Sequence, residues 1–438
     1  MPPVMMLQAG AAGAASSRAP VSAPRASLQM NGIHGQQLSA SRVAATRRTL
    51  TPFQVRAIAE PTSSNGQHTK PAVRGDIGNI KSMSGRSLEE LTDSLKSVAP
   101  KKGGPGIIVP TSSGSMLGAI SPSETKLRLF SGTSNPSLSG EIASYMGMDL
   151  GKLVIKRFAD GEVYVQVQES IRGCDVFILQ PTCPPANDNL MELLVLIDAM
   201  RRASAATITA VIPYYGYARA DRKASGRESI TAKLVANLLT EAGADRVIAL
   251  DLHSAQCVGY FDIPVDHVAG QVVILDYLSA KLSGGTDEVV VVSPDVGGVA
   301  RARGFAKRLN DAPLAIIDKR RTGHNVAEVM NLIGDVDGKV CVMVDDMIDT
   351  AGTLLKGAEL LRKKGAREVY ACATHAVFSP PAVERLSSDL FTEVIVTNSM
   401  PFDESRSFHN LTVLSVANLL GETIWRVHNS GSVQNIIH

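Results

Sequence analysis

Three carboxylates and two threonines gather within a short stretch late in the chain. Asp345 and Asp346 directly follow the apolar run Val340–Val344, and Asp349 comes just before Thr350-Ala351-Gly352-Thr353. Glycine lets a ligand approach the backbone closely and the threonines offer hydroxyl groups, which suits a phosphate. The carboxylates would repel a phosphate, so they indicate hydroxyl groups or a metal ion at the other end of the same ligand. The pattern is typical of a sugar phosphate site.

A strand, a tight loop and a helix are expected to position these groups. The apolar run predicts a buried strand over Lys339–Val344, and leucines recur at helical spacing after Thr353 as far as Gly365. A helix N-terminus carries free N–H groups and a partial positive charge, so it attracts a phosphate. The loop between the two elements is therefore the predicted phosphate site.

Other strand ends carry candidate metal-binding groups. His253 closes the run Asp251-Leu-His253, and Asp262 and Asp266 follow it. Imidazole and carboxylate groups in such a place can hold a divalent ion, although a single histidine can equally be structural. Asp295 lies between a strand of four valines and the next helix, where it could face a ligand or cap that helix.

Two loops combine cations in ways that suit phosphate transfer. Lys319-Arg320-Arg321 begins where a strand over Leu314–Ile317 ends, and it is either a clamp on transferring phosphates or a solvated basic turn. Arg219 lies in a loop rich in tyrosine and cations after the strand that ends at Pro213. That loop could stack a base and hold phosphates, or its tyrosines could pack locally.

Composition limits the classes of function. The 438-residue chain has a formal net charge of +2, which implies no broad nucleic-acid surface, and no apolar run is long enough to span a bilayer. It contains neither a P-loop nor a dinucleotide fingerprint, so any nucleotide is bound by other means. The five cysteines are scattered without a C-x-x-C pair, and we expect them reduced and mostly buried, with a disulfide as the alternative.

The chain divides into four segments. Residues 1–59 contain arginine but no Asp, Glu or Lys, which is typical of a transit peptide, for a plastid before a mitochondrion; a disordered tail is the alternative. Residues 60–125 are polar and predict a flexible N-terminal extension. Alternating strands and helices then predict an α/β fold with mainly parallel sheets. The strands are too many for one sheet, so we predict two domains, 126–270 and 271–438, which could be structural duplicates without a sequence repeat.

The expected elements follow from hydrophobic periodicity. We predict strands at Leu127–Phe130, Asp175–Gln180, Thr207–Ile212, Arg246–Asp251, Glu288–Val292, Leu314–Ile317, Lys339–Val344, Glu368–Thr374 and Glu393–Thr397. We predict helices at Pro136–Met146, Leu190–Ala203, Thr231–Ala242, Gln271–Lys281, Val299–Leu309, Thr353–Lys364 and Ser415–Val427. Alternation over residues 159–167 predicts one arm of an antiparallel hairpin.

Taken together, the motifs resemble ribose-phosphate diphosphokinase, also called phosphoribosyl pyrophosphate synthetase, in a plant-like organellar form. The resemblance runs from Leu127 to the C-terminus, and its landmarks occur in family order: Phe158–Glu162, Asn187–Leu194, Tyr217–Lys223, Asp251–His253, Phe261–Asp266, Ser293–Gly298, Asp318–Arg321 and Val344–Thr353. It implies two doubly wound phosphoribosyltransferase-like domains. The implied reaction moves the β,γ-diphosphoryl group of ATP to the 1-hydroxyl of ribose 5-phosphate with Mg²⁺ and releases AMP, for nucleotide, histidine and tryptophan synthesis.

The resemblance also implies a role for each site residue. The catalytic pair would be Lys319 and Arg321, in a loop that closes over the β-phosphate. Ribose 5-phosphate would contact Asp345, Asp346, Asp349, Thr350, Ala351, Gly352 and Thr353, with the first two on the ribose diol. ATP would contact Phe158, Asp160, Glu162, Arg219 and His253, the first three from a neighbouring subunit. The Mg²⁺ residues would be His253, Asp295, Asp251, Asp262 and Asp266.

One position departs from the family pattern. Many members carry Gln after the arginine of the ATP loop, whereas this chain has Ala220, which predicts a modest loss of ATP affinity. The segment Ser225–Ser229 resembles the region where phosphate-regulated members bind an anion, so phosphate activation and ADP inhibition are implied, as is a homo-oligomer of hexamer type. The alternatives are a nucleobase phosphoribosyltransferase and a non-catalytic regulatory subunit.

Overall fold

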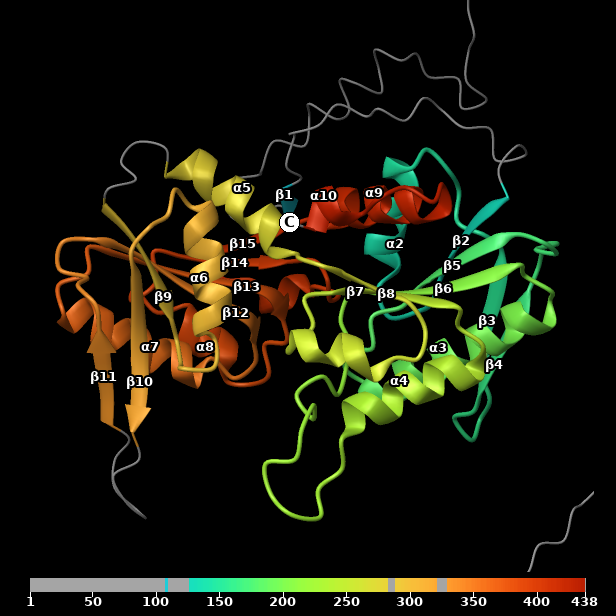
Figure 1. The fold of residues 1–438 in the computed structure, drawn as a ribbon, viewed down its shortest axis with the longest axis horizontal. Helices are drawn as coiled ribbons and strands as arrows, with labels where there is room; N and C mark the ends of the chain where they lie inside the picture. Colours follow the sequence, from blue (N-terminus) through green and yellow to red (C-terminus); the bar gives the residue numbers. More distant parts are fainter. Residues whose placement is uncertain (1–106, 109–125, 283–287, 321–328, 438) are drawn as a thin grey trace, which may run out of the picture. The chain divides into compact units, whose positions relative to one another are not determined.

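Strands alternate with helices along the chain and form two mainly parallel sheets and a separate hairpin (Figure 1). A computed structural model describes residues 107–108, 126–282, 288–320 and 329–437, so the predictions for residues 1–59 and 60–125 fall almost wholly outside the described residues. All described residues belong to one compact unit, Lys81–His438. The α/β prediction with mainly parallel sheets is confirmed, whereas the domain boundary near residue 270 stays a prediction.

The first sheet is parallel throughout. Its order is β2 (Leu127–Ser131), β5 (Asp175–Leu179), β6 (Thr207–Ile212), β7 (Arg246–Leu250), β8 (Val265–Val268). Between β2 and β5 the chain forms an antiparallel hairpin of β3 (Leu153–Arg157) and β4 (Val163–Val167). The alternation over residues 159–167 therefore marks a real hairpin arm, which begins at Val163.

The second sheet contains the same five-strand order. It runs β1 (Ile107–Ile108), β15 (Leu411–Leu414), β14 (Glu393–Thr397), β13 (Glu368–Ala376), β12 (Val340–Ile348), β9 (Val289–Ser293), β10 (Leu314–Arg320), β11 (Val329–Ile333). The run β9-β12-β13-β14-β15 repeats β2-β5-β6-β7-β8, with a hairpin after the first strand in both. The two sheets are thus structural duplicates that share topology without a sequence repeat.

Helices cover both faces of each sheet (Figure 1). They are α2 (Pro136–Tyr145), α3 (Ala186–Arg202), α4 (Thr231–Ala242), α5 (Gln271–Lys281), α6 (Val299–Arg308), α7 (Gly352–Lys363), α8 (Ala382–Leu386), α9 (Ala417–His428) and α10 (Gln434–Ile437), with 3₁₀ turns at Ala255–Tyr260 and Glu404–Arg406. Two helices are exchanged: α5 follows the first sheet but packs on β13 and β14, and α9 follows the second sheet but packs on α2.

Buried strands supply the core because alternate residues face opposite helix layers. Val289 and Val291 of β9 pack in one cluster that also contains Leu127 and Leu129 of β2, so this core continues from one sheet to the other. Val290 and Val292 face a second cluster beneath α7 and α8. The β-branched runs therefore anchor the strands in the core, and the polar groups of the site follow these runs along the chain.

Several strands extend past their predicted ends, and the extensions of β12 and β10 matter for the site. The prediction that β12 ends at Val344 is wrong, because Asp345, Met347 and Ile348 pair with β13 and extend the strand to Ile348. The prediction that β10 ends at Ile317 is wrong in the same way. Lys319 and Arg320 pair with β11, so the basic run is part of a hairpin strand rather than a loop at this point. In both cases, pairing with a neighbour overrides polar composition.

Most helix boundaries agree closely with the predictions, but α3 begins at Ala186 rather than Leu190, and α8, α10 and several short strands were missed. Helix α3 begins at Ala186 after two prolines, and α9 begins at Ala417, whose N–H donates to Ser415 Oγ at 3.2 Å. The strands β1, β3, β8, β11 and β15 were not predicted. They are short, and those such as β8, with Asp266 and His267 at its centre, lack an apolar run.

Candidate active site

The two carboxylates of β12 lie in a charged cluster with Arg301 and His253. Asp346 is almost fully buried, and its carboxylate lies 3.0 Å from Arg301 Nη1 and 2.7 Å from Nδ1 of His253. Asp345 lies 3.2 Å from Arg301 Nη1, and Arg301 Nη2 also donates to the carbonyl of His253 at 3.1 Å. One guanidinium from α6 therefore ties both β12 carboxylates to the loop that follows β7.

The cluster separates the pKa values of neighbouring carboxyls. Burial, followed by the charge of Asp346, raises the pKa of Asp345 to about 7. Burial alone would raise the pKa of Asp346 too, but the hydrogen bond with His253 and the charge of Arg301 hold it below its usual value. The same hydrogen bond raises the pKa of His253. Asp346 is thus the fixed negative charge of the pair, and Asp345 changes charge near neutral pH.

The loop after β12 leaves a helix N-terminus without a side-chain cap. Ala351 adopts the left-handed conformation with φ of 58°, and α7 starts at Gly352 without a side-chain cap among the residues that the structure describes. Thr350 is exposed and Thr353 partly so. Unpaired N–H groups at a helix start are a favourable place for an anion. Lys319 Nζ, which reaches in from β10, donates to Thr353 Oγ1 at 3.1 Å and adds positive charge there.

A cation from the first sheet reaches the same loop. Arg219, in the loop after β6, donates from Nη1 to Asp349 Oδ2 at 2.6 Å. Burial opposes ionisation of Asp349, yet hydrogen bonds with Ser379 and Arg219 lower the pKa of this carboxyl overall. The structure therefore brings together residues from distant parts of the chain at one loop, as expected for a site between two sheets.

The segment after β13 supports this loop from the other side. Phe378 N–H donates to the carbonyl of Ile348 at 3.0 Å, and Arg385 Nη1 donates to the carbonyl of Thr350 at 2.8 Å. Sequence reasoning missed Arg301, Ser379 and Arg385. A basic residue in the first turn of the helix that follows the valine strand could have suggested Arg301, but no local pattern marks Ser379 or Arg385.

Asp295 is the candidate metal-facing residue with a free oxygen. Its Oδ1 accepts the N–H of Gly298 at 2.8 Å, and no partner is found for Oδ2 among the residues that the structure describes. Those residues include no group of three or more His, Cys, Asp or Glu side chains arranged to hold a metal. Carboxylate oxygens in such small number suit an ion that brings its remaining ligands from a bound phosphate, as magnesium does.

The other three predicted metal residues have protein partners. Asp251 is bonded to Thr374 Oγ1 at the second sheet, Asp262 lies 3.5 Å from Lys233 Nζ, and Asp266 lies 2.9 Å from Arg246 Nη1. Asp266 is the second residue of β8 and lies opposite Ile248 in the middle of β7, and its carboxylate accepts from Arg246, the first residue of β7. A metal role for these three carboxylates stays a prediction.

The predicted adenine residues lie on the β3–β4 turn. Phe158 is 56% exposed and packs edge-on against the ring of Tyr164, while Asp160 Oδ1 accepts the N–H of Glu162 at 3.1 Å. No contact joins these three residues to His253 or Arg219 among the described residues. Their role with a neighbouring subunit stays a prediction. The second catalytic residue, Arg321, lies outside the described residues.

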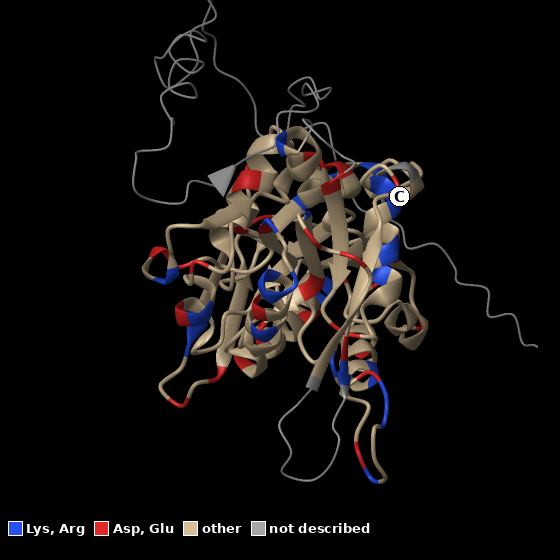
Figure 2. Ribbon diagram, turned by 90° about the vertical axis from the view of Figure 1, so that its left-hand side faces the viewer, with Lys and Arg blue, Asp and Glu red and all other residues tan. Residues whose placement is uncertain are grey.

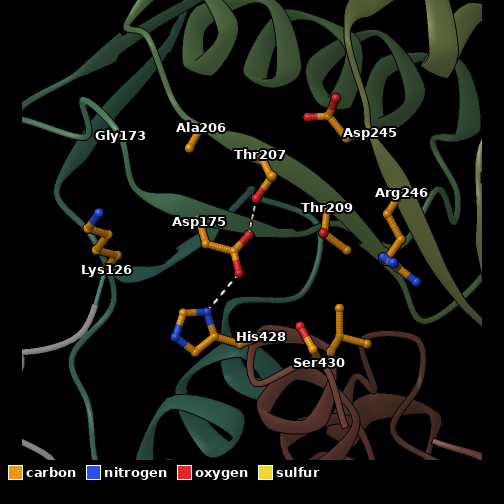
Figure 3. A pocket seen from close by; sticks show the side chains of 11 residues that line it. Lys126, Gly173, Asp175, Ala206, Thr207, Thr209, Asp245, Arg246, His428 and Ser430 are labelled. Carbon is orange, nitrogen blue, oxygen red and sulfur yellow. Dashed lines mark hydrogen bonds and ion pairs between the residues drawn. The ribbon is translucent and has the colours of Figure 1, made fainter. Parts of the chain in front are cut away.

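A cavity of about 460 Å³ lies where the strands of the first sheet begin, at the opposite end of these strands from the site (Figure 3). Asp175, Thr207 and Arg246, which begin β5, β6 and β7, line it together with His428 of α9. Asp175 Oδ2 lies 2.7 Å from His428 Nδ1, and this pair is drawn in Figure 3. The site described above follows the ends of the strands, so the cavity is separate from it.

Three further features of the described residues concern charge distribution, membrane-spanning helices and cysteines. Acidic and basic residues are interspersed over the ribbon in the view of Figure 2. Within the part of the chain that the structure describes, no helix combines the length and the apolar character needed to cross a membrane. All five cysteines are free and buried, as predicted.

Comparisons with known proteins agree with the site. Residues 127–243 match a family model described as the N-terminal domain of ribose phosphate pyrophosphokinase, and residues 324–438 match one described as phosphoribosyl synthetase-associated domain. The chain is 76% identical over 310 residues to ribose-phosphate pyrophosphokinase 1, chloroplastic, of Oryza sativa, covering 71% of this chain and 78% of that protein. It is 74% identical over 318 residues to ribose-phosphate pyrophosphokinase 1 of Spinacia oleracea, covering 73% and 94%.

A solved structure agrees with the relatives. The crystal structure of phosphoribosylpyrophosphate synthetase from Mycobacterium smegmatis is 45% identical in sequence, with a TM-score of 0.66. The match covers 70% of this chain and 99% of that one. The similarity therefore includes both halves of the fold and not the phosphate loop alone.

Proposed function

The chain belongs to the family of ribose-phosphate pyrophosphokinases and is an enzyme of phosphoribosyl pyrophosphate synthesis, and we propose that the β12–α7 junction is its acceptor site. The 1-hydroxyl of ribose 5-phosphate attacks the β-phosphorus of ATP, the bond to the α-phosphate oxygen breaks, and AMP leaves. Such a transfer needs positioning and charge stabilisation more than covalent help from the protein. The observation that carries the proposal is the uncapped start of α7 beside Asp345, Asp346 and Lys319.

The acceptor is held at both ends. Its 5-phosphate takes the free N–H groups at the start of α7 and the hydroxyls of Thr350 and Thr353. The ribose diol donates to the carboxylates of Asp345 and Asp346, whose negative charge Arg301 partly offsets. A sugar phosphate fits because the junction separates an anion-attracting end from a hydroxyl-attracting end.

The donor is held by cations from other segments. Arg219 binds the ATP phosphates and exchanges its present partner, Asp349, for them. Lys319 and Arg321 stabilise the charge that develops on the transferred diphosphoryl group. Lys319 Nζ already lies 3.1 Å from Thr353 Oγ1, so its ammonium is beside the acceptor loop before ATP binds.

Magnesium fits the residues at this site. Asp295 has one carboxylate oxygen without a partner among the described residues, and His253 of the charged cluster is a nitrogen donor, so ATP would supply most of the ligands. Bound there with ATP, the ion would neutralise phosphate charge. Before it binds, Asp346 fixes the ring of His253 through Nδ1, which leaves Nε2 to face the donor.

Assembly, regulation and location are parts of the same proposal. The exposed residues Phe158, Asp160 and Glu162 contact the adenine of a neighbouring subunit, which requires a homo-oligomer of hexamer type, and phosphate and ADP act as regulators. We place the enzyme in the plastid, since several relatives, including those of Oryza sativa and Arabidopsis thaliana, carry chloroplastic in their names. None of these names supports the mitochondrial alternative. The product then supplies nucleotide, histidine and tryptophan synthesis.

One assay tests the activity and the assigned loop. Purified protein is incubated with ATP, Mg²⁺ and ribose 5-phosphate over a range of phosphate concentrations, and AMP is measured. Wild type should form AMP only with ribose 5-phosphate, whereas Lys319→Ala should lose roughly 100-fold to 1,000-fold in kcat, as for the loss of one group that stabilises transferred charge. Lys307→Ala, an exposed change on α6, is the control. Absence of AMP with wild type would remove the proposal in favour of a regulatory subunit. Normal activity of Lys319→Ala would remove the role of that residue.

A further inference from the structure

Two residues that follow β13 contact the backbone around the phosphate loop. Phe378 N–H donates to the carbonyl of Ile348 at 3.0 Å, and Arg385 Nη1 donates to the carbonyl of Thr350 at 2.8 Å. The first contact follows from β13 lying beside β12. Arg385 is different, because it comes from the separate short helix α8 and reaches back to the loop with a charged group.

The cations around the loop are not equivalent. Arg219 is paired with Asp349, and Arg301 is paired with Asp345 and Asp346, so carboxylates already neutralise both guanidinium groups. Lys319 and Arg385 have no carboxylate partner among the described residues. A 5-phosphate brings about two negative charges beside three aspartates, and unpaired cations must offset this repulsion.

Gly352 shows how closely Arg385 approaches the start of α7. A Cβ atom at position 352 would lie 3.2 Å from Arg385 Nη1 and 3.8 Å from its Cζ. The guanidinium therefore lies against the first residue of α7, a helix start for which the described residues provide no side-chain cap. It also holds Thr350 just before Ala351, whose left-handed backbone turns the chain into the helix.

We propose that Arg385 of α8 is a further positioning residue for ribose 5-phosphate, which holds the Thr350 carbonyl and supplies unpaired positive charge beside the 5-phosphate. The inference rests on the proposed function and adds a residue to its acceptor site. Arginine suits both tasks because its guanidinium can donate several hydrogen bonds in one plane while it keeps its charge. The donor side of the site does not depend on this residue.

The test compares Arg385→Gln and Arg385→Lys with wild type in the full-length protein. Arg385→Gln should raise the KM for ribose 5-phosphate and weaken its binding by about tenfold or more, because a hydrogen-bonded charge is lost. The KM for ATP and the thermal unfolding midpoint should stay near wild type. Arg385→Lys should recover part of the loss, since lysine keeps the charge but not the planar set of donors. Arg303→Gln, an exposed change on α6, is the matched control.

Calorimetric binding of ribose 5-phosphate without ATP separates this inference from the proposed function. If wild type binds the sugar phosphate but forms no AMP, the proposed function fails, and the inference still stands or falls on the binding of the two variants. If the binding of Arg385→Gln equals that of wild type, the inference is overturned. It is also overturned if wild type does not bind ribose 5-phosphate. A third contrary result would be that Arg385→Gln raises both KM values and lowers the unfolding midpoint together, because Arg385 would then be a merely structural residue.

Discussion

The β12–α7 junction and the β5–α3 junction occupy the same place in two duplicated sheets, but only one is left open for a ligand. Each follows the second strand of its five-strand run, and each leads into a helix without a side-chain cap. At β12–α7 the polar groups are carboxylates, threonine hydroxyls and free N–H groups. At β5–α3 the corresponding loop is Gln180–Pro185, and its polar groups are already paired within the protein.

Gln180 shows how the β5–α3 junction is filled. Its side chain is fully buried, its Oε1 accepts from Ser134 Oγ at 2.7 Å, and its Nε2 donates to Glu192 at 3.0 Å. A Cβ atom on Gly132 would overlap the same Oε1, so this amide fills the space beside the end of β2. In the first sheet, the polar side chain that follows β5 is therefore satisfied by contacts within the protein.

The two junctions have the same position in the fold topology, but their side chains give them different roles. At β5–α3, buried hydrogen bonds stabilise the fold, because each unpaired partner would cost free energy. At β12–α7, a few charged contacts hold the loop, and the helix start has no side-chain cap within the described part of the chain. Changes at the first junction should therefore alter stability, and changes at the second should alter ligand binding.

The largest effect is expected from Glu192→Leu at the β5–α3 junction. The Glu192 carboxylate is fully buried and accepts the N–H of Thr133 at 2.7 Å, the Gln180 amide, and Arg157 Nη2 at 3.4 Å. Removing it leaves the buried donors of Thr133 and Gln180 without a partner, so the free energy of unfolding should fall by about 3 to 5 kcal/mol, at about 1 to 3 kcal/mol for each donor. Denaturant unfolding measures this loss. The kcat of the remaining folded enzyme should not change.

Glu241→Leu, on the exposed face of α4, is the control for that substitution. It should change the free energy of unfolding by less than about 0.5 kcal/mol. If Glu192→Leu kept wild-type stability but lost activity, the β5–α3 junction would contribute to ligand binding. The proposed difference between the two junctions would then be wrong.

A matched threonine pair tests both junctions with the same substitution. Thr353→Val removes a hydroxyl that contacts only Lys319 at 3.1 Å among the described residues, and it should raise the KM for ribose 5-phosphate about tenfold. Thr182→Val removes a buried hydroxyl that accepts the N–H of Gly216 at 2.6 Å, and it should cost about 1 to 3 kcal/mol of unfolding free energy. Steady-state kinetics and thermal unfolding are measured on both variants, and exchanged outcomes would refute the division between the junctions.

The pH dependence of stability should differ between the junctions. Burial, with the charge of Asp346, raises the pKa of Asp345 to about 7 from a usual value near 4, so the folded state retains a proton that the unfolded state releases. The contribution of Asp345 to the free energy of unfolding therefore falls as pH rises from about 4 to 7. The contribution of His253, whose pKa is also raised, is complete below its usual pKa and is lost as pH rises through the folded value.

Asp345→Asn removes one of these two contributions. Its unfolding midpoint should fall less than that of wild type between about pH 5 and pH 7. Thr182→Val, which removes no titratable group, should keep the wild-type slope. Equal slopes for wild type and Asp345→Asn would show that Asp345 does not titrate in this range.

Sequence patterns locate the second junction well because its chemistry is local. Asp345, Asp349 and Thr353 lie within one strand, loop and helix, and hydrophobic periodicity identifies those elements. The order of the strands and the duplicated topology are not local properties. Pairing between β10 and β11 or between β12 and β13 decided where these strands end, against their polar composition.

Contacts between distant residues are the part that sequence could not supply. Arg385 is 35 residues from the Thr350 carbonyl that it contacts, and Arg219 is 130 residues from Asp349. Neither distance along the chain follows a periodic pattern, because only the packing of α8 and of the β6–α4 loop creates these contacts. The buried contact between Gln180 and Glu192 could not be predicted from the sequence for the same reason.

The smallest effect is expected from Ala220→Gln, which tests how the first sheet serves the site. We expect the first sheet to contribute to the site through the β6–α4 loop and not through the β5–α3 junction. A new amide beside Arg219 should then improve the binding of ATP and leave the binding of ribose 5-phosphate unchanged. Ala220 is held through its backbone, with its N–H on the carbonyl of Tyr217 at 3.0 Å and its carbonyl on the N–H of Ala232 at 3.2 Å, so a longer side chain need not disturb the loop. One neutral hydrogen bond should lower the KM for ATP about threefold. Ala220→Leu, of similar size without an amide, should not, and the KM for ribose 5-phosphate should stay constant in both. A change in ribose 5-phosphate binding would mean that the two sheets do not divide donor and acceptor between them.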